Sequence, residues 1–69
     1  MTSEEFSAWA DKYNLSIEQA AKVLGTSRAN GFKYANGSRP VSKAVAYGAE
    51  AIDLLPKKES LKLIHKRLA

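Results

Sequence analysis

Apolar residues recur along this chain at the spacing of an α-helix. Near the start, the residues at positions i, i+3, i+4 and i+7 are Phe6, Trp9, Ala10 and Tyr13. Residues at this spacing share one face of a helix. Just before them, Thr2 and Glu5 stand three residues apart in the pattern of a capping box. The sequence therefore predicts a first helix that ends near Asn14.

Two shorter helices follow. Ser16 and Gln19 repeat the capping-box pattern. The apolar face of this second helix consists of Ile17, Ala20, Ala21 and Leu24. Gly25 is expected to end it, because glycine adopts the left-handed conformation found at helix C-termini. A third helix is predicted over Ser27–Ala35, with Ser27 as its N-cap and Asn36-Gly37 at its end.

The rest of the chain predicts two more helices, Ser42–Leu55 and Lys57–Leu68, separated by Pro56. The first of them turns inward with Val45, Ala49 and Ile52. The second has an apolar seam of Leu61, Ile64 and Leu68. No segment alternates apolar and polar residues over the length of a strand. The expected fold class is all-α: a compact bundle of about five helices forming one domain, residues 1–69.

The composition disfavours several kinds of site. With no cysteine and a single histidine, His65, the chain has too few parts for a zinc cluster or a histidine-based triad. The acids Asp11, Glu18, Glu50 and Asp53 form no evident catalytic pair. We therefore expect no enzyme activity, metal, cofactor or small-molecule ligand. Long apolar runs and a signal peptide are also missing, which predicts a cytoplasmic protein without a membrane partner.

The net charge of +4 is distributed unevenly. Residues 1–27 sum to −2, whereas residues 28–69 carry nine basic side chains against three acidic ones. A sequence pI near 9.6 with the cations gathered in one part indicates a polyanionic partner. The alternative is a soluble basic protein without such a partner.

Two of the predicted helices form a pair typical of a helix-turn-helix, Ile17–Leu24 and Ser27–Ala35 joined by Gly25-Thr26. Ala21 supplies the small residue that a close helix crossing needs. The stretch LSIEQAAKVLGTSRANGFKYANGSRPVS, residues 15–42, resembles the phage Cro/repressor type of helix-turn-helix family. The stretch GSRPVSKAVAYGAEAI is similar to the exit region of anti-CRISPR-associated repressors.

The resemblance implies that the second helix of the pair lies in the major groove of double-stranded DNA and reads base edges. The matched positions are Arg28, Ala29, Asn30, Phe32 and Lys33. An arginine at this place can bind guanine O6 and N7, worth about 1–3 kcal/mol of discrimination. Lys33 reads a guanine, binds a phosphate or stays solvated, and Ala29 contacts a thymine methyl or acts as a spacer. For Asn30, capping or water binding is favoured over an adenine contact.

Seven further positions match the family's contacts to the DNA backbone. They are Gln19, Thr26, Ser27, Asn36, Ser38, Arg39 and Lys43. Ser27 is expected to cap its helix first and to touch a phosphate second. Capping-box and turn roles are the stronger interpretation of Gln19 and Thr26. Such contacts set register and affinity without reading sequence, and they weaken as salt rises.

One position departs from the family pattern. Gly31 stands where the family usually has a branched apolar residue, and Phe32 follows it. Glycine in a helix costs about 1 kcal/mol relative to alanine. We expect Gly31 to bring its helix closer to Trp9 or to the second helix. Phe32 then either lies in the groove or fills the vacated core space, and the core is favoured.

One recognition helix covers only a few base pairs, so such domains normally pair on two half-sites. We expect a homodimer built from the end of the fourth helix and from residues 57–68, with Leu61, Ile64, Leu68 and Tyr47 as candidate contacts. For Tyr47 the core is favoured. The sequence as a whole predicts a small phage-type autoregulatory repressor that acts as a dimer on a palindromic operator. The alternative is a protein-interaction module of the antitoxin or anti-repressor type.

Overall fold

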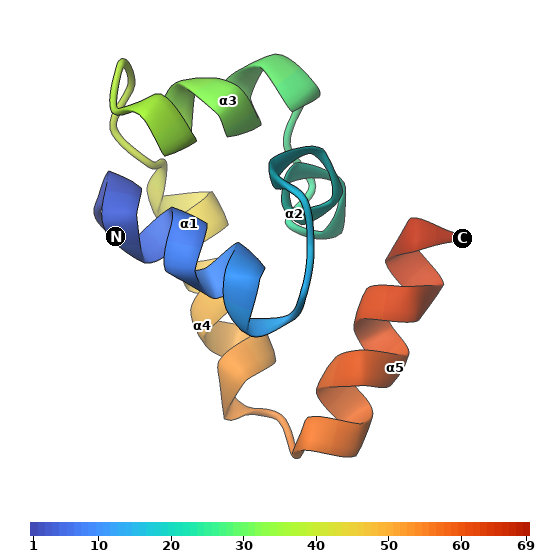
Figure 1. Ribbon diagram of the computed structural model, residues 1–69. Helices are drawn as coiled ribbons and strands as arrows, with labels where there is room; N and C mark the ends of the chain where they lie inside the picture. The colour runs from blue at the N-terminus through green and yellow to red at the C-terminus, as the bar shows by residue number, and fades with distance from the viewer.

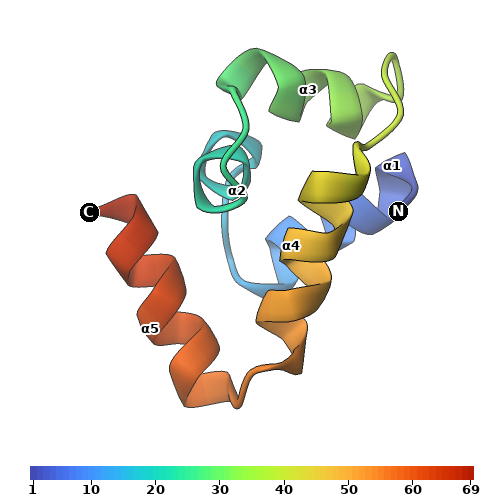
Figure 2. The same ribbon diagram turned by 180° about the vertical axis from the view of Figure 1, so that it is seen from behind.

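The computed structural model describes residues 1–69 as five helices without a strand. They are α1 (Ser3–Lys12), α2 (Ile17–Val23), α3 (Arg28–Asn36), α4 (Lys43–Leu54) and α5 (Lys57–Leu68). The all-α prediction and the order of the helices are confirmed. In Figure 1, α3 lies across one end of the molecule, above α1 and α2. From their connection at Pro56, α4 and α5 diverge (Figure 2).

Side-chain caps set the starts of α1 and α2, as predicted. Thr2 and Ser16 each accept a backbone hydrogen bond in a complete capping box, with Glu5 and Gln19 as the reciprocal acceptors. The first helix ends near Asn14, as predicted. The helix stops at Lys12, and Asn14 adopts a left-handed conformation with φ of 57°. The backbone N–H of the residue after Asn14 then reaches back to Ala10 O over 2.9 Å, which closes the helix end.

The core takes side chains from all five helices. The buried apolar residues that form it are Phe6, Trp9, Ala10, Ala20, Val23, Tyr34, Val45, Ala49, Ile52 and Ile64. Phe6 and Tyr34 meet edge to face, with ring centroids 5.7 Å apart, and so join α1 to α3. The inner faces predicted for α1 and α4 are confirmed. Val23 was not part of the face predicted for the second helix.

Polar side chains join α5 to the rest of the bundle. Ser60 is buried, and its hydroxyl donates to Ile52 O over 2.7 Å at the end of α4. Arg67 donates from Nη1 to Val23 O over 2.7 Å at the end of α2. Both acceptors belong to the last turn of a helix, where carbonyls have no partner within the helix. These two hydrogen bonds explain why Ser60 occupies a core position and why the Arg67 guanidinium lies against the protein rather than in solvent.

Two of the predicted dimer contacts on α5, Ile64 wholly and Leu68 partly, are used within the chain itself. Ile64 is only 2% exposed and belongs to the core, and Leu68 packs against that core from its edge. Leu61 is partly exposed. On α4, the expectation that Tyr47 lies in the core is wrong, because this side chain is 64% exposed. Val45, Ala49 and Ile52 fill the inner side of α4 as predicted, and Tyr47 lies outside that side, among the exposed residues of the helix.

Candidate nucleic-acid interface

The turn between α2 and α3 is tightly defined by backbone hydrogen bonds. Gly25 has φ of +76°, in the left-handed region that favours glycine. Its N–H bonds to Lys22 O over 3.2 Å, and the Thr26 N–H bonds to Ala21 O over 3.0 Å. These two bonds are those of a Schellman motif. Ser27 then caps α3 by accepting the Asn30 N–H over 3.1 Å, so both helix ends at the turn are satisfied.

Gly31 lies at the contact between α2 and α3. A Cβ atom placed on Gly31 would stand 2.8 Å from the Ala21 Cβ and 3.4 Å from Ile17 O, on the neighbouring helix. No pair of side chains larger than glycine and alanine fits this separation without movement. The prediction that Gly31 permits a closer approach is confirmed for the second helix. Ala21 is the small residue at the crossing, as expected.

The opposite side of α3 faces solvent. Gly31 and Tyr34 are its buried residues. Five residues form its exposed side, here named the α3 outer face: Arg28, Ala29, Phe32, Lys33 and Asn36. The Arg28 guanidinium lies 5.6 Å from the centroid of the Phe32 ring, which is a cation–π contact. Four of the five predicted base-contacting residues therefore share one free surface.

Phe32 corrects the sequence-based preference for the core. Its side chain is 45% exposed, and the space opened by Gly31 is taken up by the approach of α2 instead. The helix has not rotated to bury the ring. A large apolar ring beside a cation and open to solvent is available to a ligand.

Asn30 turns aside from this surface. It is half-buried, and its amide nitrogen donates to Thr26 Oγ1 over 3.2 Å. Its amide oxygen accepts from Arg39 Nη1 over 2.7 Å. Both ends of the amide are thus engaged within the protein. Asn30, for which capping or water binding was favoured over a base contact, holds Arg39 beside α3.

The remaining candidates for backbone contact surround the α3 outer face. Ser27 is exposed and serves as the N-cap, and Thr26 accepts from Asn30. Gln19 serves the second capping box through its Oε1 atom, as the stronger interpretation held. At the end of α3, the Asn36 carboxamide oxygen accepts the Ser38 N–H over 2.9 Å. The exposed residues Ser38, Arg39 and Lys43 follow one another from the end of α3 to the start of α4.

An acid within this surface was not anticipated. Glu18, in the first turn of α2, lies 3.6 Å from Arg28 between Oε2 and Nε, and both side chains are well exposed. The pair spans the α2–α3 crossing, so sequence spacing within one helix gave no signal for it. An exposed ion pair of this kind contributes at most about 1 kcal/mol. Arg28 can therefore leave it for a stronger partner.

A second polar cluster lies away from α3 and ties α4 to α1. Asp53 accepts hydrogen bonds from Trp9 Nε1 over 3.0 Å and from the Tyr13 hydroxyl over 2.6 Å. The Lys12 ammonium lies 2.9 Å from the same carboxylate. Burial by itself raises the pKa of Asp53, but these donors outweigh it and hold the pKa below the ordinary 3.8. Burial, followed by the bond to Asp53, raises the pKa of Tyr13 to about 12. Every member of this cluster is used in holding two helices together.

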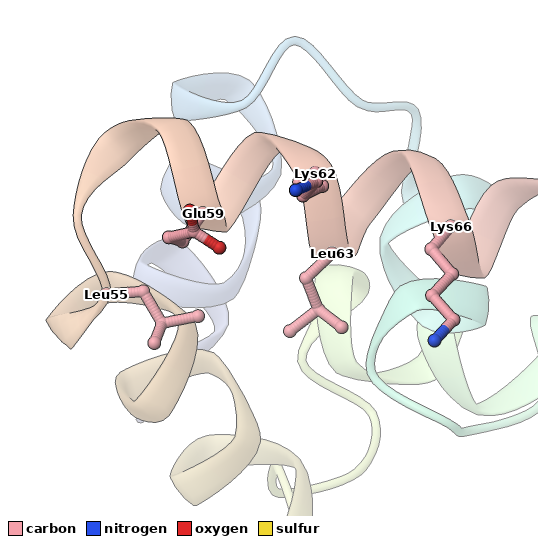
Figure 3. Close-up of a pocket in the computed structure, with 5 residues that line it drawn as sticks. All are labelled: Leu55, Glu59, Lys62, Leu63 and Lys66. Carbon is pink, nitrogen blue, oxygen red and sulfur yellow. The ribbon is translucent and has the colours of Figure 1, made fainter.

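A hollow beside α5 has a different character. It encloses about 300 Å³ beside Leu55 and Leu63, with Glu59, Lys62 and Lys66 also lining it. In Figure 3, the side chains of Leu63 and Lys66 project from the same side of α5. Glu59 is its one acid, and no hydroxyl or imidazole lines it. The chain as a whole contains no group of three metal-ligating side chains, and no helix has the length and apolarity needed to cross a membrane.

Comparison of the chain with protein families, curated proteins and solved structures found no match. Its function is therefore inferred from its own side chains.

Proposed function

We propose that this chain is a sequence-specific DNA-binding transcriptional regulator, which presents α3 to the major groove of double-stranded DNA. One observation carries the proposal: Arg28, Ala29, Phe32 and Lys33 form one free face of α3, while glycine and alanine make the contact behind it. A helix whose outward side chains have no structural partner beyond an exposed ion pair is suited to an external ligand. The cations among them select a polyanion.

Each residue of the α3 outer face has a distinct role in this proposal. Arg28 exchanges Glu18 for guanine O6 and N7. Phe32 and Ala29 contact thymine methyl groups, which are the apolar features of the major groove. Lys33, one turn after Ala29, binds a guanine or a phosphate. Asn36 stands at the end of α3, where the backbone of the duplex passes.

The cations that follow α3 bind phosphates. Arg39 is held in place by Asn30 over 2.7 Å, which reduces the conformational freedom it loses on binding. Ser38 and Lys43 extend the same row toward α4. These contacts position the protein, and the base contacts specify the site. The α2–α3 pair acts in this scheme as a helix-turn-helix of the Cro/repressor type.

We further propose that the chain is an autoregulatory repressor of the phage type, which acts in the cytoplasm of a bacterial host by occluding a promoter. A second candidate function is supported by one feature of α4, whose Tyr47 and Leu54 are 64% and 79% exposed. These side chains suit a protein-interaction module of the antitoxin or anti-repressor type. Salt-sensitive, sequence-selective DNA binding separates the two functions.

The deciding experiment selects bound DNA from a random pool at two salt concentrations. The expected result is one enriched sequence whose affinity falls with rising salt. The same selection with Arg28→Ala is expected to lose preference at a single base pair, and Lys62→Ala on α5 serves as a charge-matched control that keeps the preference. Retention of DNA at low salt without enrichment of any sequence contradicts the proposal.

Phe32→Ala distinguishes a ligand-facing ring from a structural one. Because the ring is 45% exposed, we expect a loss of unfolding free energy below about 1 kcal/mol, together with a changed preference at thymine positions. Thermal unfolding followed by circular dichroism measures the first quantity, and the selection above measures the second. Phe6→Ala is the matched control, since that ring is fully buried and its loss costs about 3–5 kcal/mol. A loss of that size for Phe32→Ala excludes the groove contact.

A further inference from the structure

The last turn of α2 leaves one carbonyl group without a backbone partner. The last four carbonyls of a helix find no N–H group within that helix. In α2, those of residues 20–22 accept the N–H groups of residues 24–26 over distances of 3.0 to 3.2 Å. The fourth, Val23 O, accepts no backbone hydrogen bond. Val23 is 0% exposed, so water does not reach this carbonyl, and the end of α2 depends on a donor from elsewhere in the chain.

The side chain of Arg67, on α5, supplies this donor. Its Nη1 atom lies 2.7 Å from Val23 O, the distance of a strong charge-assisted hydrogen bond. A cation at this place also meets the negative end of the α2 dipole. Along α5, Arg67 follows the buried residues Ser60 and Ile64 at intervals of four and three positions, so the three share one side of the helix. The fold of α5 therefore directs this arginine at the end of α2.

A second cation makes the reverse contact. Lys22, in the last turn of α2, donates from Nζ to Leu68 O at the end of α5 over 3.5 Å. The C-terminal ends of α2 and α5 thus lie near each other, and each meets a cation of the other helix (Figure 1). Two such ends carry partial negative charges and repel each other unless cations neutralise them. The Lys22 contact is long and exposed, so Arg67 is the stronger of the two ties.

We propose that Arg67 is a positioning residue for DNA binding, which acts from α5 to fix the direction in which α3 leaves the turn. The proposal deepens the function proposed above and rests on it. Val23 O directly follows the two carbonyls that hold Gly25 and Thr26 in the Schellman motif. Without its donor, Val23 O needs water, and the last turn of α2 has to open to admit it. This opening loosens the adjacent bonds to Gly25 and Thr26, and with them the orientation of α3.

The other polar tie of α5 provides a contrast within the same helix. Ser60 donates to Ile52 O over 2.7 Å at the end of α4, and Ile52 is only 2% exposed. Loss of this bond also deprives a buried carbonyl of a donor, but far from the turn between α2 and α3. If Arg67 merely anchors α5, the loss of either tie has the same effect on that turn. If Arg67 positions α3, only its own loss disturbs the turn.

Hydrogen exchange of backbone amides, followed by NMR without DNA, measures the order of the turn. Arg67→Met removes the donor and keeps a long side chain. This variant is expected to speed exchange at Gly25 and Thr26 by at least about tenfold relative to the amides of α1. Arg67→Lys keeps the charge and one donor group, so we expect it to restore part of the protection. Ser60→Ala is the control, and equal exchange at the turn in Arg67→Met and Ser60→Ala overturns the proposal.

Binding to the selected DNA is measured at a temperature at which circular dichroism shows every variant to be folded. Arg67→Met is expected to bind about tenfold more weakly, with an unchanged slope of log affinity against log salt, because its effect passes through α2. Lys66→Met, adjacent and equal in charge, and Ser60→Ala are expected to stay within about twofold of the wild type. A salt slope that falls by about one for Arg67→Met assigns Arg67 to a phosphate instead and overturns the positioning role.

The two measurements separate failure of this inference from failure of the proposed function. If no DNA sequence is ever selected, the proposed function fails, and exchange at Gly25 and Thr26 still decides whether Arg67 orders the turn. If DNA is selected and Arg67→Met binds it as tightly as the wild type does, the proposed function stands and the positioning role is wrong.

Discussion

Helices α3 and α5 are both cationic, yet they present their charges in different ways. Five basic residues lie on α5 and only two on α3. On α5, Lys58, Lys62 and Lys66 form a row of exposed ammonium groups at intervals of four residues. On α3, Arg28 and Lys33 flank an exposed aromatic ring, and Arg39 is held beside them by Asn30.

The difference teaches that the number of cations does not identify the nucleic-acid surface. A row of lysines binds any polyanion through its charge, and salt screens that attraction. Reading a sequence requires bidentate donors and apolar contacts at fixed places on base edges. Only α3 combines these groups on one face. The predictions below test this contrast, beginning with the largest expected effect.

Equal loss of charge from the two helices should have unequal consequences. Arg28→Ala with Lys33→Ala is expected to weaken binding to the selected DNA by about 2–4 kcal/mol, because base contacts are lost. Lys62→Ala with Lys66→Ala removes the same charge, but exposed charges more than about 10 Å from the duplex are screened at 0.1 M salt. Fluorescence anisotropy with labelled DNA measures both affinities. Equal losses for the two pairs would remove the distinction between α3 and α5.

The close contact behind α3 is tested by filling it. Gly31→Ala is expected to lower the unfolding free energy by about 1–3 kcal/mol, since the new methyl group would stand 2.8 Å from the Ala21 Cβ. Gly48→Ala on α4 is the control. Its new methyl group meets Leu24 at an ordinary 3.7 Å, and the gain in helix propensity, about 1 kcal/mol, is kept. Chemical denaturation followed by circular dichroism measures both.

A double variant isolates the contact from other effects of the substitution. Ala21→Gly combined with Gly31→Ala exchanges the methyl group between the two helices and relieves the clash. We expect the double variant to be more stable than the sum of the two single changes predicts. Additive losses would mean that the separation of α2 and α3 is set elsewhere.

Substitutions in the Asp53 cluster test whether the part of the molecule that holds this cluster unfolds together with the part that holds α3. Asp53→Asn is expected to cost about 1 kcal/mol, since two neutral donors and one ammonium lose a charged acceptor. The folded-state pKa of Asp53 is lowered, so its contribution to stability is present above pH 3.8 and is lost as the pH falls through the folded value. At alkaline pH the raised pKa of Tyr13 matters in the same way. Its contribution to the unfolding free energy is lost between pH 10.0 and about 12.

Unfolding followed by Trp9 fluorescence and by circular dichroism at several pH values measures these effects. In a cooperative domain of this size the two signals give the same midpoint at each pH. Asp53→Asn should reduce the loss of unfolding free energy at acid pH, and Tyr13→Phe should reduce the loss at alkaline pH. Separate midpoints for the two signals would show that the regions are independent.

The smallest effect is expected for Glu18→Gln. This change releases Arg28 from its ion pair and removes a negative charge that phosphates repel. Exposed pairs contribute about 0–1 kcal/mol, so binding to DNA is expected to tighten only a few-fold. Glu59→Gln on α5 is the matched control, with no measurable change expected. Weaker binding of Glu18→Gln would show that the acid positions Arg28 rather than competing for it.

Local features of this fold were predictable from the sequence, and orientations between helices were not. The capping boxes depend on residues three positions apart, so Thr2 and Ser16 identified two helix starts. The inner face of α1 was correct, because its apolar stripe has polar residues opposite. On α4 the side of Val45, Ala49 and Ile52 was also predicted correctly, but the pattern did not show that Tyr47 lies outside it.

In the candidate site, too, local features were predictable from the sequence and contacts between elements were not. The exposure of Arg28 and Lys33 followed from the helical period once the buried side of α3 was known. Phe32 was assigned to the core because the sequence did not show that α2 fills the space at Gly31. Asn30 accepts a hydrogen bond from Arg39, nine residues away in the sequence, and Asp53 accepts one from Tyr13, forty residues away. Such partners depend on how helices cross, which no local pattern encodes.

The contact between Gly31 and Ala21 also bears on which residues of α3 can be exchanged. Because the contacts that hold α3 to the bundle, Gly31 against Ala21 and Tyr34 against Phe6, lie on its inner side, the five side chains on its other side contribute little to folding. They are free to be exchanged for others without loss of the scaffold. If α3 reads DNA as proposed, new operator preferences are accessible by substitution at a few surface positions, with the bundle beneath left intact.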